Sequence, residues 1–591
     1  GRSYAGFVTA VAVLAALAAG GTMAYHHFFQ RAGEGAAQLI PSDADMVITV
    51  DTMPSVNQVA LFSRIAAAVK REDLIGRWND LTASAIHGSE AAKRVEPFLK
   101  GSGAFAIWNL AAGAQPDRSA AVALLAIREP DKVRQTLSQY GQRKSQNGAD
   151  YMQLGPKTYA EVSGDYLVVS NEPSILSRVE ATRRGTAKSV GSLPDYRNAR
   201  ASLPHDPNVM MFVSGRALSR LSSFSNGAGG LTSATRPPAP RWTTVGATLE
   251  DSGIVIDTRT LADDRAIPSL KPLAGIQPLS PALLKELPSG AFGVMAISQP
   301  AGFWRYFVGA ARQNPEMEKI AANAANEFRS ETGLDLDHDI LPEMRGGAAV
   351  AVYPGPAFRR TVGIGAASGS QLLVVFDSEN GADPGSLAPR LMDAVIRLAH
   401  GTLRFTEVSR NGVTIWTAGS ESGFTAAASS MAAGMLGGPA SLAAGARPTL
   451  ELAQAGRLLI LASSPQIMDR ALSVYHGAGQ SLADDPAFQS MVRRWSPHAQ
   501  DSLMVDLAAV MAAVKPLLAA IPTETHNALS ADDIAGLFGR SGAGLVTSGG
   551  YDGHLGAGSF FLPLDYDRAI HVAAVLADQK SPSVPGPMLG A

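Results

Sequence analysis

Hydrophobic positions run without a charge from Tyr4 to Tyr25, near the start of the chain. At about 1.5 Å of rise per helical residue, a run of this length crosses a hydrocarbon core of roughly 30 Å. Tyr4 at one end, and Tyr25, Phe28 and Phe29 at the other, are placed like the interfacial anchors of a membrane helix. The pattern therefore predicts a transmembrane anchor over residues 1–30.

Small residues recur along one face of this predicted helix. Ala12, Ala16, Gly20 and Ala24 follow one another every four residues, a spacing that lets two helices approach closely in lipid. This spacing favours a helix that packs against the membrane helix of a partner. The alternative is an alanine-rich anchor that packs against nothing.

The remainder of the chain shows one pattern twice, with apolar strand-like runs between helix-like stretches. The first copy opens with LIPSDADMVITV at residues 39–50, and the second opens with ELPSGAFGVMAI at residues 286–297. Each copy closes with a hairpin signal, a polar turn between alternating runs, near residues 242–260 and 545–562. Other strands are predicted in matching order at 104–108 and 348–353, 121–127 and 371–376, 164–170 and 456–462, and 209–213 and 502–505. Helices are predicted at 59–70 and 302–312.

Runs of strands with interspersed helices indicate the α+β class. The predicted fold is one N-terminal transmembrane helix followed by two tandem homologous α+β domains with mainly antiparallel sheets. The predicted segments are a juxtamembrane linker at 31–40, a first repeat at 41–262, a Pro-rich linker at 263–283, a second repeat at 284–564, and a C-terminal helix with a Pro-rich tail at 565–591.

An Ala/Gly-rich insertion at residues 419–448 has no counterpart in the first copy. It carries no charge between Glu421 and Arg447, which favours a segment that docks on a partner or on the bilayer. The alternative is a surface loop. The candidate docking residues are Phe424, Met431, Met435 and Leu436.

Composition narrows the class of protein. The net charge is -2, with 17% charged and 46% hydrophobic residues, which is the composition of a folded globular chain. Arginine pairs such as Arg183-Arg184, Arg359-Arg360 and Arg493-Arg494 are isolated and are interpreted as solvated surface, so nucleic-acid binding is disfavoured. The chain has no cysteine, which excludes disulfides, a thiol nucleophile and thiolate metal sites and fits an exported bacterial protein.

The densest cluster of potential metal ligands contains Asp335, Asp337, His338 and Asp339. Its alternating carboxylates resemble the opening of a calcium loop, but Ile340 stands where that loop requires glycine. A capped helix start is therefore the preferred interpretation. His26-His27 is interpreted as a polar collar beside the membrane rather than as a metal or haem site.

Motifs that identify a reaction are absent from the sequence. There is no HExxH, phosphate loop or dinucleotide fingerprint, and the stretch GRSGA at residues 539–543 lacks the last glycine of a serine elbow. The sequence therefore predicts no catalytic residue, no cofactor and no metal site.

Three stretches carry a resemblance to a known family: LIPSDADMVITVDTMPSVNQVALFSRI at 39–65, GDYLVVSNEPSIL at 164–176 and GLDLDHDILPEMRGGAAVAV at 333–352. The chain resembles an uncharacterised family of exported bacterial proteins, catalogued as a domain of unknown function. The resemblance covers roughly residues 39–565. It implies an N-terminal signal or anchor and a large repeated α+β ectodomain, and it brings no catalytic residues.

Three functions are compatible with these patterns. The first is a non-catalytic accessory or scaffolding subunit, held in the bacterial inner membrane with its bulk in the periplasm. Its expected partners are the lipid bilayer and the transmembrane subunits of a larger respiratory, photosynthetic or secretory complex. The second is a periplasmic protein that binds a lipid or another hydrophobic ligand in a cleft between the two copies or under a curved sheet. The third is an unrecognised hydrolase.

Overall fold

The computed structural model describes most of the chain between residues 32 and 578. The described residues are 32–51, 61, 65, 94–109, 119–204, 206–225, 239–312, 315–344, 346–355, 370–377, 387–398, 404–419, 449–496, 498–519, 531–538 and 544–578. The predicted anchor, most of the helix predicted at 59–70, and the insertion from residue 420 to residue 448 lie outside these ranges.

The first half of the chain forms ten strands in the spatial order β4-β5-β6-β7-β3-β2-β1-β8-β9-β10, and every neighbouring pair is antiparallel. Alternate residues of a strand such as β3 are buried, as expected when one face covers a core. The strands are β1 (Met46–Val50), β2 (Leu99–Trp108), β3 (Ala120–Ile127), β4 (Gln142–Gln146), β5 (Ala149–Gly155), β6 (Thr158–Ser163), β7 (Tyr166–Ser170), β8 (Val209–Ser214), β9 (Trp242–Glu250) and β10 (Gly253–Leu261).

The second half repeats this order, as β14-β15-β16-β17-β13-β12-β11-β18-β19-β20, again with antiparallel pairs throughout. The strands are β11 (Gly293–Ile297), β12 (Ala348–Pro354), β13 (Ser370–Asp377), β14 (Phe405–Arg410), β15 (Val413–Gly419), β16 (Thr449–Ala455), β17 (Leu458–Ala462), β18 (Asp501–Val505), β19 (Leu545–Tyr551) and β20 (Leu555–Pro563). The strands predicted from the alternation of apolar residues are therefore confirmed, with boundaries that differ by a few residues.

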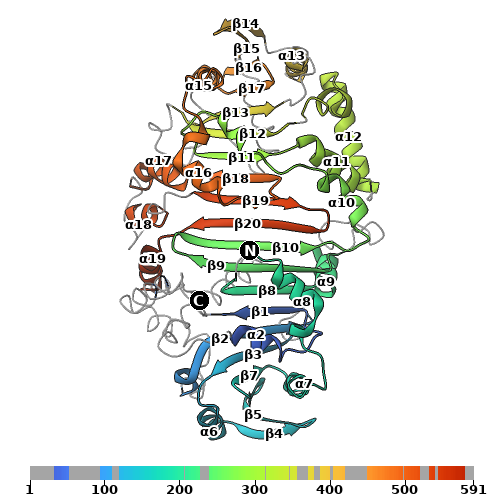
Figure 1. The fold of residues 1–591 in the computed structure, drawn as a ribbon, viewed down its shortest axis with the longest axis vertical. Coiled ribbons are helices and arrows are strands. Elements are labelled where there is room, and N and C mark those ends of the chain that lie inside the picture. The colour runs from blue at the N-terminus through green and yellow to red at the C-terminus, as the bar shows by residue number, and fades with distance from the viewer. Residues whose placement is uncertain are drawn as a thin grey trace, which may run out of the picture.

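The two halves join into one sheet, because β10 pairs with β20 along its whole length, from Gly253 opposite Pro563 to Leu261 opposite Leu555. The described strands form a single sheet of 20 strands. Figure 1 shows them stacked along the long axis of the molecule, from β4 at one end to β14 at the other.

The predicted fold class is therefore wrong in its organisation. Within the described residues, the structure has one continuous antiparallel sheet with helices, rather than two tandem domains with separate sheets. The prediction failed because β10 and β20 each look like the last strand of a separate unit, and only their mutual pairing merges the units. Within the described residues, none of the helices has the length and apolar character needed to cross a membrane.

Many helices begin with proline, whose missing N–H leaves no hydrogen bond unmade in the first helical turn. The helices are α2 (Ala32–Ala37), α6 (Pro130–Tyr140), α7 (Pro173–Arg183), α8 (Pro194–Ala201), α9 (Gly215–Ser225), α10 (Ile267–Ala274), α11 (Pro300–Ala311), α12 (Pro315–Thr332), α13 (Leu387–Leu398), α15 (Pro465–Tyr475), α16 (Pro486–Val492), α17 (Leu507–Ala519), α18 (Ala531–Gly536) and α19 (Tyr566–Asp578). Short helices of one or two turns lie at Glu96–Phe98, Val190–Ser192, Pro281–Glu286, Leu336–Ile340 and Leu482–Asp484. The helix predicted at 302–312 corresponds to α11, and the Pro-rich linker contains α10.

Helices α7 and α15 occupy matching places and make matching contacts. In the first half, the guanidinium of Arg178 on α7 lies 5.3 Å from the centroid of the Trp108 ring. In the second half, Arg470 on α15 lies 5.1 Å from the centroid of the Tyr353 ring. Each contact attaches a helix to the sheet through a cation–π interaction.

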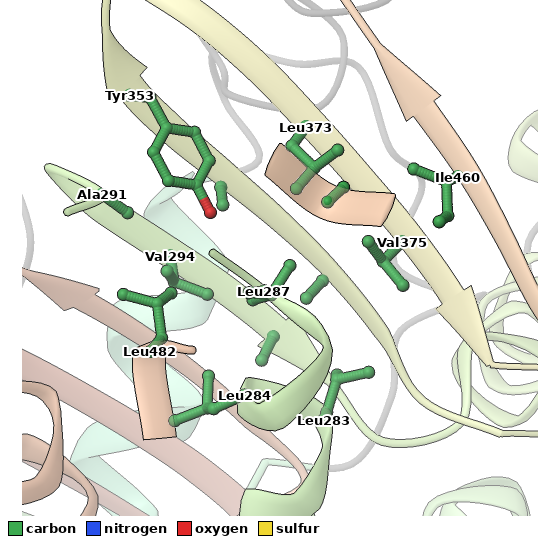
Figure 2. Packing of buried hydrophobic residues seen from close by; sticks show 14 of the residues in the cluster. Leu283, Leu284, Leu287, Ala291, Val294, Tyr353, Leu373, Val375, Ile460 and Leu482 are labelled. Atoms are coloured by element: carbon green, nitrogen blue, oxygen red, sulfur yellow. The ribbon is translucent and has the colours of Figure 1, made fainter. Parts of the chain in front are cut away.

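The core follows the sheet in two large clusters, one in each half. The cluster of the second half also includes Val255 of β10, so it extends across the junction. Figure 2 shows side chains from separate strands and turns, among them Leu284, Leu482 and Val294, gathered in this cluster. The buried hydroxyl of Tyr353 donates to the carbonyl oxygen of Pro288 at 2.9 Å, so its polar atom is satisfied.

Candidate functional site

The site residues proposed from the sequence lie outside the described residues. This applies to the helix-packing residues Ala12, Ala16, Gly20 and Ala24, to the interfacial anchors Tyr4, Tyr25, Phe28 and Phe29, and to the docking residues Phe424, Met431, Met435 and Leu436. His26-His27 and the GRSGA stretch lie outside as well. The predictions that rest on these residues stay predictions.

The acidic cluster after α12 is a capped helix start, as preferred from the sequence. The carboxylate of Asp335 accepts hydrogen bonds from the backbone N–H groups of Asp337, at 2.9 Å, and His338, at 3.1 Å. Such capping satisfies N–H groups that have no partner within the helix. Asp335 also pairs with Arg329, and Asp339 pairs with Arg390.

A cleft of about 490 Å³ lies over the junction between the two halves. Its floor is formed by β10 and β20, and its walls come from the chain that follows α8 and from the end of α16. Each half therefore contributes a strand and a wall. The lining residues are Pro204, Glu250, Ser252, Val255, Asp257, Arg259, Ser490, Arg493, Arg494, Trp495, Ser496, Ser559 and Phe561.

The pairing register of β10 with β20 determines which residues form the polar centre of the cleft floor. Asp257 of β10 lies directly opposite Ser559 of β20, and Val255 lies opposite Phe561. Because β10 and β20 are the last strands of matching hairpins, the floor combines corresponding parts of the two halves. Alternation along β10 turns Val255, Asp257 and Arg259 toward the same face.

Arg494 ties the second half to the first across the cleft. Its Nη1 lies 2.9 Å from Oε2 of Glu250, and its Nη2 donates to Oγ of Ser252 at 2.9 Å. The guanidinium also lies 3.4 Å from the centroid of the Phe561 ring. With 24% of its side chain exposed, Arg494 is a largely enclosed inter-half contact, where an ion pair is screened less than at a free surface.

Asp257 and Arg259 are buried charges at the other side of the floor, with 4% and 7% of their surfaces exposed. Arg259 donates through Nε to the carbonyl oxygen of Ser202 at 3.2 Å, and through Nη1 to those of Thr258 at 2.9 Å and Gly558 at 3.1 Å. Burial lowers the pKa of Arg259, and the nearby charge of Asp257 partly opposes this effect. The pair thus brings opposite charges into the cleft that largely offset each other.

Arg493 differs from its neighbour. Its side chain is exposed, and among the described residues it makes no ion pair. Two residues further along the chain, the indole Nε1 of Trp495 is buried and has no hydrogen-bond acceptor within the described part of the chain. Among the described lining residues, Arg493 is therefore an arginine without a partner carboxylate.

Sequence reasoning missed this site. Arg493-Arg494 was interpreted as solvated surface, and that interpretation is wrong for Arg494, which contacts Glu250, Ser252 and Phe561. These partners lie far from it in the sequence, and no local pattern links them. By contrast, Arg183 and Arg184 lie at the surface, where both pair with Glu180.

The fold and the cleft define an α+β protein built on one antiparallel sheet, with a mixed polar and apolar cleft at its centre. The chain belongs to the family described as "Protein of unknown function (DUF3352)", whose model matches residues 7–438. The β10 side of the cleft lies within the matched range, and the wall from α16 lies beyond it.

No curated protein matches the chain. The solved chain titled "Structure of crystal form I of TP0453" is similar at 10% identity and a TM-score of 0.22, over 39% of this chain and 79% of that chain. This likeness is too weak to support an argument about fold or function.

Proposed function

We propose that this protein is a non-catalytic binding protein that holds a small ligand in the cleft between its two halves. The observation that carries the proposal is the cleft itself, about 490 Å³ in volume and lined by both halves. A volume of this size is typical of small-molecule sites, which combine apolar walls with a few polar groups.

The lining supports binding better than it supports a reaction. Among the described residues around the cleft there are arginines, carboxylates and serine hydroxyls, but no histidine that would act as a base toward a serine. Arg494 is already engaged by Glu250 and Ser252. Such groups hold and orient a ligand rather than transform it.

The test is a thermal-shift screen of the full chain against a library of small molecules. Ser559→Phe is the blocking variant, because Ser559 lies in the floor opposite Asp257 and a phenyl ring there fills the cleft. Ser409→Phe on the exposed strand β14 is the matched control. We expect compounds that raise the melting temperature of the wild type and the control to have no effect on Ser559→Phe. Identical responses of all three proteins would reject the proposal.

A second candidate is the scaffolding function predicted from the sequence, and we propose that its partner polypeptide docks at the β14 end of the sheet. Among the described strands, β14 pairs only with β15, so one of its edges is open. An open edge of this kind can accept a strand from a partner. The insertion with the candidate docking residues leaves β15 and returns to β16, which are neighbouring strands at the same end.

Purification from native membranes with the full chain as bait tests this second function. A variant that lacks residues 420–448 provides the comparison. We expect stoichiometric partner subunits with the wild type and their loss from the deletion variant. Recovery of the same partners with both proteins would exclude the insertion as the docking segment.

A further inference from the structure

We propose that the ligand of the cleft is an organic anion, a carboxylate or phosphate attached to an aromatic or acyl body, and that Arg493 binds its charged group. This inference rests on the proposed binding function of the same cleft and names the chemical class of ligand. It follows from the charges, the hydrogen-bond donors and the apolar surface of the lining.

The charges of the cleft leave one arginine unmatched. Glu250 is paired with Arg494 at 2.9 Å, and Asp257 lies near Arg259, with which it interacts electrostatically. Among the described residues of the lining, these two are the carboxylates, whereas a third arginine, Arg493, is present. A ligand that carries a negative charge would balance the cleft, because a cation beside a partly enclosed volume attracts anions more strongly than one in bulk water.

A hydrogen-bond donor accompanies this charge. Oγ of Ser252 accepts from Arg494, which leaves its own hydrogen free to point at a ligand. An anion supplies acceptor oxygens, which suit both this hydroxyl and the guanidinium of Arg493.

Apolar groups of the lining suit the rest of the ligand. Val255 and Phe561 belong to the floor, Pro204 lies on the opposite wall, and Trp495 packs against the core of the second half. A small charged ion alone would leave this surface unused. An aromatic or acyl body covers it and gains from the removal of apolar area from water.

The two arginines in the wall of the cleft, Arg493 and Arg494, come from the second half and have no counterparts in the first. Counting from the prolines that begin α8 and α16, Ala201 and Ser202 stand where the second half has Arg493 and Arg494. The cleft is therefore asymmetric although its two halves share a strand order. An asymmetric site distinguishes the charged end of a ligand from its apolar end.

The experiment is isothermal titration calorimetry of the full chain with phenyl phosphate, benzoate and the uncharged phenol. We expect both anions to bind more tightly than phenol, and Arg493→Gln to weaken the anions by about tenfold or more, the cost of one charge-assisted hydrogen bond. Arg493→Lys keeps the charge and is expected to lose less. Arg305→Gln is the matched control, because Arg305 is an exposed arginine of α11 with no ion pair among the described residues.

Vesicles made of equal amounts of phosphatidylcholine and phosphatidic acid distinguish the two sources of such an anion. Sedimentation with these vesicles that is lost in Arg493→Gln assigns the contact to a lipid phosphate. Binding of the soluble anions that is weakened in Arg493→Gln, without sedimentation, assigns it to a soluble ligand. Either result supports the inference, because both depend on Arg493.

Two other results would overturn the anion inference, and they distinguish its failure from a failure of the proposed binding function. If wild type and Arg493→Gln bind every anionic probe equally, or bind none, the anion inference fails. The binding function survives that result if the library screen still finds neutral compounds that Ser559→Phe no longer binds. If Ser559→Phe loses no ligand, the proposed function fails as well.

Discussion

At the scale of single residues, the molecule contains buried charges whose environments differ sharply. Arg494 is surrounded by a carboxylate, a hydroxyl and an aromatic ring. Glu161 of β6 has only 7% of its surface exposed, and its Oε1 has no partner among the described residues. Burial, and then the neighbouring charge of Glu180, raise the pKa of Glu161 to about 8, although Arg183 and Arg184 act in the opposite direction.

The raised pKa of Glu161 makes stability depend on pH. Between pH 4.5 and about pH 8, the folded state keeps a proton on Glu161 that the unfolded state releases. The contribution of Glu161 to the free energy of unfolding therefore falls as pH rises through this window, by at most about 1.4 kcal/mol per pH unit, and is constant above it. We expect Glu161→Gln, which carries no charge, to gain stability over the wild type progressively from pH 5 to pH 8.

Urea denaturation of both proteins at several pH values measures this difference. Glu407→Gln is the control, since Glu407 is an exposed glutamate on β14 and its replacement should leave the pH profile unchanged. A difference between wild type and Glu161→Gln that stays the same at all pH values would show that Glu161 titrates normally in the folded protein.

At the scale of elements, two hairpins use glycine for different reasons. In the β14–β15 hairpin, Asn411 and Gly412 have φ values of 51° and 78°, as in the favoured two-residue turn, and a Cβ on Gly412 would meet nothing within 4 Å. Gly253 begins β10 with φ of 151°, and a Cβ there would lie 2.1 Å from the carbonyl oxygen of Leu562 on β20. Gly253 therefore allows the two halves to come together.

We expect Gly253→Ala to lower the free energy of unfolding by about 2–4 kcal/mol, because backbone strain and a clash with β20 add up. Gly412→Ala keeps only the backbone strain and is expected to cost about 1 kcal/mol. Chemical denaturation of the two variants compares them directly. Equal losses would mean that β20 does not approach Gly253 as closely as the structure has it.

At the scale of the whole molecule, the pairing of β10 with β20 turns two similar halves into one sheet. Thr258 lies directly opposite Gly558 in this pairing. A Cβ on Gly558 would lie 3.9 Å from Cβ of Thr258, which is close to the usual Cβ separation of a disulfide. The chain has no cysteine of its own, so no native thiol would compete with an engineered pair of cysteines for disulfide formation.

The double variant Thr258→Cys with Gly558→Cys is therefore expected to form a disulfide on mild oxidation. A faster-migrating band on non-reducing electrophoresis and the loss of free thiol measure the reaction. The control, Ile254→Cys with Gly558→Cys, places the thiols several residues out of register and should stay reduced. Failure of the first pair to oxidise would contradict the continuous sheet.

Local patterns in the sequence determined the identity and order of many elements, although they did not predict the strands β4–β6 and β14–β16. Alternating apolar residues mark strands such as β3 and β12, and prolines mark the starts of helices such as α7 and α15. The cap at Asp335 was also predictable, because a capping side chain acts on backbone groups within a few residues of itself. These features depend on neighbours along the chain, so the sequence displays them directly.

Only the tertiary structure decided how the halves meet and where the cleft lies. The alternation of buried and exposed residues along β10 and β20 would be the same if each strand lay at the edge of a separate sheet. This alternation depends on which face of the sheet is buried, and it does not depend on which strand pairs with the edge. For the same reason the sequence did not distinguish Arg494, which pairs with Glu250 of the other half, from Arg493, which remains exposed. The site depends on contacts between residues about 240–300 positions apart, and such contacts leave no local pattern to detect.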